Sequence, residues 1–161
     1  MPLTTLREFL DRNHVKYLVI SHSVAYTAQG IAALVHLSGK KLAKTVIVKI
    51  DGVLAMAVVP ASHHVDLGLL KASAGAQRVE LASETEFKDK FPDCETGAMP
   101  PFGNLYGMTV FVDQSLAEND EITFNAGTHR ELVRMDWQDL VRLVAPRIVR
   151  LTSTIVVKPA A

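Results

Sequence analysis

The sequence has very little of what cross-links small proteins or gives them a metal centre. It contains one cysteine, Cys94, in 161 residues, which excludes an internal disulfide and a CxxC zinc site. A lone thiol fits a reducing compartment, so we expect a cytoplasmic protein. The first residues lack a basic stretch followed by an apolar run, which predicts no signal peptide. Glycine, proline or charge interrupts every apolar stretch well before the ~18–20 residues that a membrane span needs.

An excess of charge of either sign is also missing. Lys plus Arg and Asp plus Glu are 17 each, and the formal net charge is zero. This argues against a protein that holds nucleic acid by bulk charge alone. A local basic patch remains open, because lysines 40, 41, 44 and 49 lie close together in the sequence. With 48% hydrophobic and 21% charged residues, the composition predicts one globular domain over residues 1–161, with 150–161 as a loose tail.

A β-hairpin is the clearest structural signal in the chain. Two apolar runs, 42–50 and 53–59, flank Asp51-Gly52, a dipeptide that tolerates positive φ at both positions. Short helices are predicted over 5–12, after a cap at Thr4 or Thr5, and over 27–35, 67–74, 84–91 and 137–144. Further strands are predicted over 15–20, 77–81, 108–112, 121–124 and 131–135. This order lacks regular βαβ alternation. It predicts an α+β fold with a mixed, curled, barrel-like sheet surrounded by short helices.

The first candidate site residue is Lys44, inside the strand Leu42–Ile50. Strand alternation places Lys44 on the face of Val46 and Val48, where an uncompensated charge is costly. Such a lysine could bind a carbonyl or phosphate oxygen, with its pKa lowered by burial. The alternative is a strand-end lysine whose ammonium reaches water.

Two glycine segments are the other candidates. In the loop Gly97-Ala98-Met99-Pro100-Pro101, glycine lets the backbone approach a ligand and two prolines stiffen it. Rigid N–H groups are what a developing oxyanion needs. His129 follows the glycine turn of Asn125-Ala126-Gly127-Thr128 and could orient a substrate or a water. A plain connecting loop and a surface turn histidine are the alternatives.

Other chemistry-bearing residues give weaker signals. The adjacent His63 and His64 point in different directions and have no carboxylate or thiol at ligand spacing, so no metal site is predicted. Cys94 lies near the glycine loop but is interpreted as an incidental thiol. GxSxG, HExxH, Walker and GxGxxG motifs are absent. No cofactor is expected.

Taken together, three segments resemble the YbaK/EbsC family, also found as the insertion domain of bacterial prolyl-tRNA synthetases. The resemblance spans roughly residues 6–144. It depends on the order and spacing of Leu42-Ala43-Lys44-Thr45-Val46, Gly97-Ala98-Met99-Pro100-Pro101 and Phe124-Asn125-Ala126-Gly127-Thr128-His129. Each motif is weak alone, but all three in this order make the assignment fairly specific.

The resemblance implies an enzyme that edits mischarged tRNA in trans by hydrolysing its aminoacyl ester. The catalytic positions it implies are Lys44, Gly97, Pro101 and His129; the substrate-binding positions are Ala28, Ile31, Val46, Lys49, Ala98, Met99 and Gly127. It favours alanine on proline tRNA, recognised at the acceptor end, with a synthetase as a further partner. A second sieve of this kind is needed because a synthetase pocket rejects a slightly smaller side chain by only ~1–3 kcal/mol.

Three other interpretations stay open. One is a deacylase for seryl- or cysteinyl-tRNA, because pocket size depends on side chains that the sequence does not place. Another is a non-catalytic module that binds tRNA or a synthetase, although the joint presence of Lys44, Gly97 and Pro101 counts against it. The last is a hydrolase for a small acyl ester or amide without RNA.

Overall fold

A computed structural model describes residues 4–21 and 42–153 of the chain. The helix predicted over 27–35, with Ala28 and Ile31, lies outside the described residues. So does the part of the predicted tail that follows residue 153.

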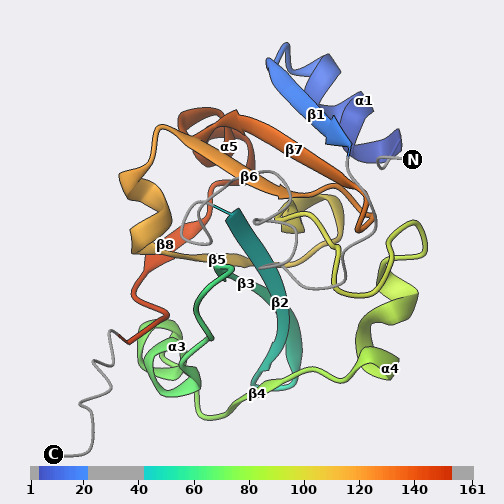
Figure 1. Ribbon diagram of the computed structural model, residues 1–161. Helices are drawn as coiled ribbons and strands as arrows, with labels where there is room; N and C mark the ends of the chain where they lie inside the picture. Colours follow the sequence, from blue (N-terminus) through green and yellow to red (C-terminus); the bar gives the residue numbers. More distant parts are fainter. Residues whose placement is uncertain (1–3, 22–41, 154–161) are drawn as a thin grey trace, which may run out of the picture.

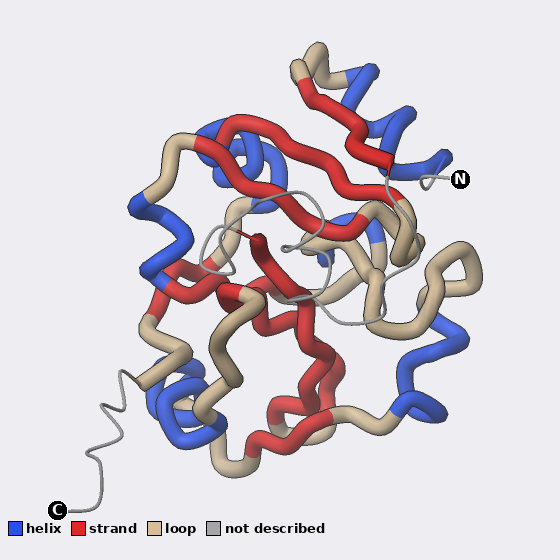
Figure 2. Tube along the Cα trace, in the orientation of Figure 1, coloured by secondary structure: helices blue, strands red, loops and turns tan. Residues whose placement is uncertain are grey.

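One mixed sheet organises the described residues, with helices at its periphery (Figures 1 and 2). Its eight strands are β1 (Tyr17–Ser21), β2 (Leu42–Ile50), β3 (Val53–Pro60), β4 (Val79–Leu81), β5 (Val110–Asp113), β6 (Glu121–Asn125), β7 (Glu131–Asp136) and β8 (Arg147–Val149). The strand order is β1-β7-β6-β2-β3-β5-β8, and β4 pairs with β2 beside this path. The pairs β2–β6, β3–β5 and β5–β8 are parallel and the others are antiparallel.

The predicted hairpin forms the centre of the sheet. β2 and β3 pair from Ala43–Pro60 to Ile50–Val53, and Asp51 and Gly52 both have positive φ, 50° and 84°. This is the geometry of the two-residue turn that matches strand twist. The Asp51 carboxylate also accepts hydrogen bonds from the N–H groups of Gln77 and Arg78, at 2.9 and 2.8 Å, which holds the turn against the approach to β4.

Four α-helices lie in the described part of the chain, and capping residues account for the bounds of two of them. They are α1 (Thr4–Arg12), α3 (Leu67–Ala74), α4 (Glu84–Phe87) and α5 (Trp137–Val144). Asp66 caps α3 by accepting from the Leu69 N–H, and Gly75 ends it in the left-handed conformation. Ser83 and Glu86 form a capping box at the start of α4. That helix is shorter than predicted, because the chain tightens into a 3₁₀ turn over Lys88–Lys90.

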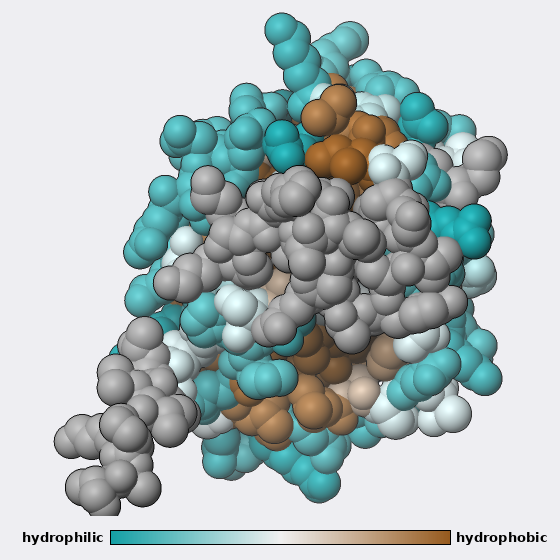
Figure 3. All heavy atoms as spheres, viewed as in Figure 1, coloured by the Kyte–Doolittle hydropathy of each residue, from teal (hydrophilic) through white to brown (hydrophobic). Residues whose placement is uncertain are grey.

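Two apolar clusters pack on the two faces of the central hairpin. Ile47 and Met56 belong to the larger cluster, together with Phe102 and Phe124. Val48 belongs to the smaller one, which lies between the sheet and α3. Apolar side chains gather on the surface in the region of β2, β4 and α3 (Figure 3). Neighbouring residues of β2, such as Ile47 and Val48, thus point to opposite faces of the sheet. The same alternation determines the face on which Lys44 lies.

The predicted α+β class with a mixed sheet and short surrounding helices is confirmed, although the sheet path remains open at β1 and β8. The sequence reading missed β8 (Arg147–Val149), which pairs in parallel with β5. Its three residues follow Pro146 and are too few to show a period of two. Pairing with a distant strand forms it.

Candidate functional site

β2 changes its partner along one edge, and this break creates the candidate site. β6 pairs with Leu42 and Ala43, and β4 pairs with the stretch from Val48 to Ile50. Between them, within the described part of the chain, residues 44–47 pair with no strand on this edge. The Ile47 carbonyl points outward here and accepts from the Ala82 N–H at 3.0 Å. Alternation gives Thr45 the same backbone orientation, so its N–H and C=O face the break.

The predicted glycine loop closes this break because it is bound to the β6–β7 turn. The Glu95 N–H donates to the Gly127 carbonyl at 2.7 Å, and the Gly127 N–H donates to the Ala98 carbonyl at 2.9 Å. Gly97 and Gly127 have φ of 85° and 91°, values that favour glycine. The second and third sequence motifs, about thirty residues apart, thus form one unit.

His129 adds a third link to this unit. Its Nε2 lies 2.8 Å from the Thr96 carbonyl oxygen. A carbonyl can only accept, so Nε2 carries the proton and donates it. The imidazole is 8% exposed, and its Cε1 lies 3.6 Å from the position that a Cβ on Gly97 would occupy. The ring therefore packs over Gly97 and anchors the loop.

A hollow of about 240 Å³ opens between the loop and the β2 edge. It is lined by Thr45, Val46, Ile47, Leu81, Ala82, Phe87, Thr96, Gly97 and Met99. The predicted substrate-binding residues Val46 and Met99 and the predicted catalytic Gly97 thus share one cavity. Ala98 and Pro101 are buried beside it rather than lining it.

Lys44 lies next to this hollow but on the other face of the sheet. Ala43 pairs with Phe124 and both pack in the larger apolar cluster, so the next residues, Lys44 and Asn125, share the opposite face. Burial lowers the pKa of the Lys44 ammonium. Among the described residues, no hydrogen bond or ion pair holds this ammonium, and none joins it to the Gly97 loop.

Lys49 has a different environment from Lys44. Its ammonium lies 2.6 Å from Glu86 and 3.5 Å from Glu80. The hydrogen bond with Lys49 lowers the pKa of Glu86 to about 2, and the pair raises the pKa of Lys49. Lys49 of β2 thus forms ion pairs with Glu80 of β4 and Glu86 of α4. It does not line the hollow.

Asn125 is a site candidate that the sequence reading missed. It is only 6% exposed, and its Oδ1 is a buried oxygen without a hydrogen-bond partner in the described structure. Its place at the end of a strand, before a glycine turn, made it look like a turn residue. Its burial distinguishes Asn125 from an ordinary turn residue, and burial at the end of a strand cannot be predicted from the sequence.

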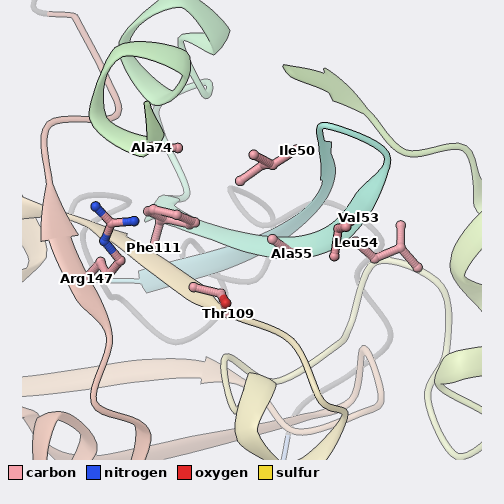
Figure 4. A pocket seen from close by; sticks show the side chains of 8 residues that line it. All are labelled: Ile50, Val53, Leu54, Ala55, Ala74, Thr109, Phe111 and Arg147. Carbon is pink, nitrogen blue, oxygen red and sulfur yellow. The ribbon is translucent and has the colours of Figure 1, made fainter. Parts of the chain in front are cut away.

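A second hollow, of about 200 Å³, is lined by residues of β2, β3, β5, β8 and α3 (Figure 4). The Arg147 guanidinium lies over the Phe111 ring, 5.0 Å from its centre, and donates to the Ser73 carbonyl at 3.2 Å. None of the predicted site residues lines this second hollow. In the ranges 4–21 and 42–153, no group of His, Cys, Asp or Glu is arranged to hold a metal ion. No helix there is long and apolar enough to cross a bilayer.

Comparison with known proteins decides the family. The profile of the aminoacyl-tRNA editing domain matches residues 22–143, a range that includes all three sequence motifs and the hollow. The chain belongs to this family. Its resemblance to the YbaK and prolyl-tRNA synthetase insertion domains is therefore confirmed.

Relatives of two architectures support the assignment. The chain is similar to the multifunctional Ser/Thr-tRNA deacylase ProXp-y of Escherichia coli (strain K12), 27% identical over 150 residues that cover 90% of this chain and 89% of that protein. It is also similar to the proline–tRNA ligase of Bacillus mycoides (strain KBAB4), 30% identical over 87 residues, 54% of this chain and 15% of the ligase. The editing domain thus matches both a stand-alone protein and part of a synthetase.

Solved structures agree on the fold. A crystal structure described as that of a proposed trans-editing enzyme for prolyl tRNA synthetase superposes with a TM-score of 0.78, at 20% identity, over 92% of this chain and 94% of that one. The structure of hypothetical protein APE2540 gives a TM-score of 0.83, also at 20% identity, over 92% and 99%. At this identity the likeness shows a shared fold.

Proposed function

We propose that this editing domain hydrolyses the ester of mischarged tRNA carrying a small amino acid, with alanine on proline tRNA as the first expected substrate. The observation that carries the proposal is the hollow between β2 and the Gly97 loop, in a chain of the aminoacyl-tRNA editing family. Its walls are mostly apolar, as a methyl side chain requires. An editing pocket of this kind must admit the small, wrong amino acid and reject the larger, correct one.

A serine or threonine substrate is the second candidate. The name of the Escherichia coli relative supports it, and so does the presence of Thr45, a hydroxyl-bearing residue, in the lining of the hollow. A hydroxyl could pair with a substrate hydroxyl, and a site built for such a pair strongly rejects analogues that lack it. The side chain of Thr45 therefore separates the two candidates.

The chemistry needs no side-chain nucleophile, because an aminoacyl ester is already activated. Of the residues from Gly97 to Pro101, the two prolines have no N–H, and the Ala98 N–H donates to the Glu95 carbonyl at 3.0 Å. The N–H groups of Gly97 and Met99 remain, with no partner among the described residues, to stabilise the oxyanion formed when water attacks. Lys44 would hold the terminal phosphate or the ester carbonyl, and His129 would keep the loop in position.

The test is deacylation of alanyl-, seryl-, threonyl- and cysteinyl-tRNA, each prepared on proline tRNA and on the matching tRNA. Alanine on proline tRNA should be hydrolysed fastest. Thr45→Val is the control, because it keeps the shape of the side chain and removes the hydroxyl. If the substrate is alanine, Thr45→Val should retain activity; if it is serine or threonine, that variant should lose it. A protein inactive on the whole panel, yet able to bind tRNA, would be a binding module.

RNA dependence separates tRNA editing from hydrolysis of small esters. Affinity for the acylated RNA should fall steeply as salt rises, because phosphate contacts release counterions. Equal activity on a free aminoacyl ester would favour the small-molecule interpretation. A Lys44→Ala variant as active as wild type would remove Lys44 from the site.

A further inference from the structure

The side chain of Asn125 is buried in a way that should destabilise the folded protein. Its Oδ1 is buried and, among the described residues, has no hydrogen-bond partner. Leaving a buried polar group unsatisfied is unfavourable, and native structures do so rarely. The assignment of Oδ1 and Nδ2 in a side-chain amide can be exchanged, but neither atom has a hydrogen bond to a described residue. Such an amide is typical of a group kept for a ligand.

The position of Asn125 indicates which ligand. The β2–β6 pairing ends at Ala43 and Phe124, so the residues that follow, Lys44 and Asn125, lie on the same face of the sheet. Two residues further along the chain is Gly127, which binds the Gly97 loop through Glu95 and Ala98. Asn125 is therefore linked through the backbone to the loop that lines the hollow and shares a sheet face with Lys44, whose ammonium has no partner among the described residues. A substrate bound by both Lys44 and this loop would bring its acylated end near the Asn125 amide.

We propose that Asn125 binds the terminal ribose of the acylated RNA through the free hydroxyl next to the ester. This inference rests on the proposed deacylase function. An amide presents a donor and an acceptor, and a ribose hydroxyl also presents both. A phosphate only accepts, and the Lys44 ammonium suits it better. The substrate ammonium only donates, and on Asn125 it would lie beside a like charge.

The first test measures whether Asn125 is kept for binding rather than for stability. Asn125→Leu has nearly the same shape and removes the buried amide, so its melting temperature should equal or exceed that of wild type. The matched control is Asn13→Leu, because the Asn13 amide donates to the Phe9 carbonyl at 2.8 Å and its loss should lower the melting temperature. A larger drop for Asn125→Leu than for the control would show a structural role and overturn the proposal.

The second test measures the contact itself with a double-mutant cycle. Wild type and Asn125→Leu are each assayed on mischarged tRNA with a normal or a 2′-deoxy terminal adenosine, the amino acid being on the 3′ oxygen. On the normal substrate Asn125→Leu should lose about tenfold in kcat/KM, which corresponds to one neutral hydrogen bond. On the deoxy substrate the variant and wild type should be equal.

The outcomes separate this inference from the proposed function. If wild type deacylates the normal substrate and Asn125→Leu loses the same factor on both substrates, the amide contacts another group and the ribose contact is wrong. If the variant loses nothing on either substrate, Asn125 does not bind the substrate at all. If wild type is inactive on every mischarged tRNA, the deacylase function fails and the ribose contact fails with it, whatever the melting temperatures show.

Discussion

Replacing His129 by alanine tests whether this residue holds the Gly97 loop or takes part in the chemistry. The change removes the hydrogen bond from Nε2 to the Thr96 carbonyl, 2.8 Å long, worth ~0.5–1.5 kcal/mol net. It also removes a ring, 8% exposed, that packs over Gly97. Lost bond and lost packing together give a destabilisation of about 1–3 kcal/mol. In a domain of this size that lowers the melting temperature by about 2–10 °C.

The effect on activity should be larger than the effect on stability. Two hydrogen bonds through Gly127 remain, so the loop stays near its place but loses one of three anchors. Misplacing catalytic groups by about 1 Å can cost on the order of 10²-fold, and we expect a loss of this order in kcat on the best substrate. Thermal melting and single-turnover deacylation measure the two effects.

The His129→Gln variant decides between anchoring and chemistry. Its amide nitrogen can donate to the Thr96 carbonyl but cannot act as an acid or base near neutral pH. An anchor should be largely restored by glutamine, in both melting temperature and kcat. A glutamine variant that melts like wild type but is as inactive as His129→Ala would refute the anchoring argument and give His129 a direct part in proton transfer.

Three other variants test the surroundings of the site. Burial lowers the pKa of Lys44, so wild-type deacylation should decline as pH rises through that lowered pKa. The rate of Lys44→Arg should stay constant over the same pH range. A Lys44→Arg profile that declines in parallel with wild type would contradict this role of the charge. Lys49 lowers the pKa of Glu86 from 4.5 to about 2. The stabilisation of the fold by this ion pair is therefore complete above pH 4.5 and is lost as pH falls towards 2. In equilibrium unfolding, Lys49→Met should show a weaker dependence of stability on acid pH, and its kcat should equal that of wild type. Burial raises the pKa of Cys94 to about 11, so thiol reagents should react slowly at pH 8 and Cys94→Ala should deacylate like wild type.

The local elements of the fold were predictable because their signals are local. Asp51-Gly52 determines its own turn geometry, and Asp66 with Gly75 sets both ends of α3. The side of β2 on which Lys44 lies also followed from alternation alone. These features need only a few neighbouring residues, and the sequence contains all of them.

The connection between the motifs could not be read in the same way. That Gly127 binds Glu95 and Ala98 depends on how β6 and β7 turn back across the sheet, over about thirty residues of chain. The same holds for Lys49, whose partner Glu86 comes from the helix after β4. A lysine on a strand looks alike in sequence whether it is ion-paired or unpaired, so burial and partners had to come from the structure.

The break in the pairing of β2 explains why this sheet can hold a binding site without losing its core. One edge of β2 is fixed by β6 at Ala43 and by β4 at Val48, while the other edge is paired with β3 along its full length. The backbone between the two fixed points therefore cannot drift, although on one side it faces a cavity. Thr45 and Ile47 are buried and still line the hollow. Filling the break with another strand pair would remove the cavity, so we interpret the short length of β4 and of the β2–β6 pairing as part of the site.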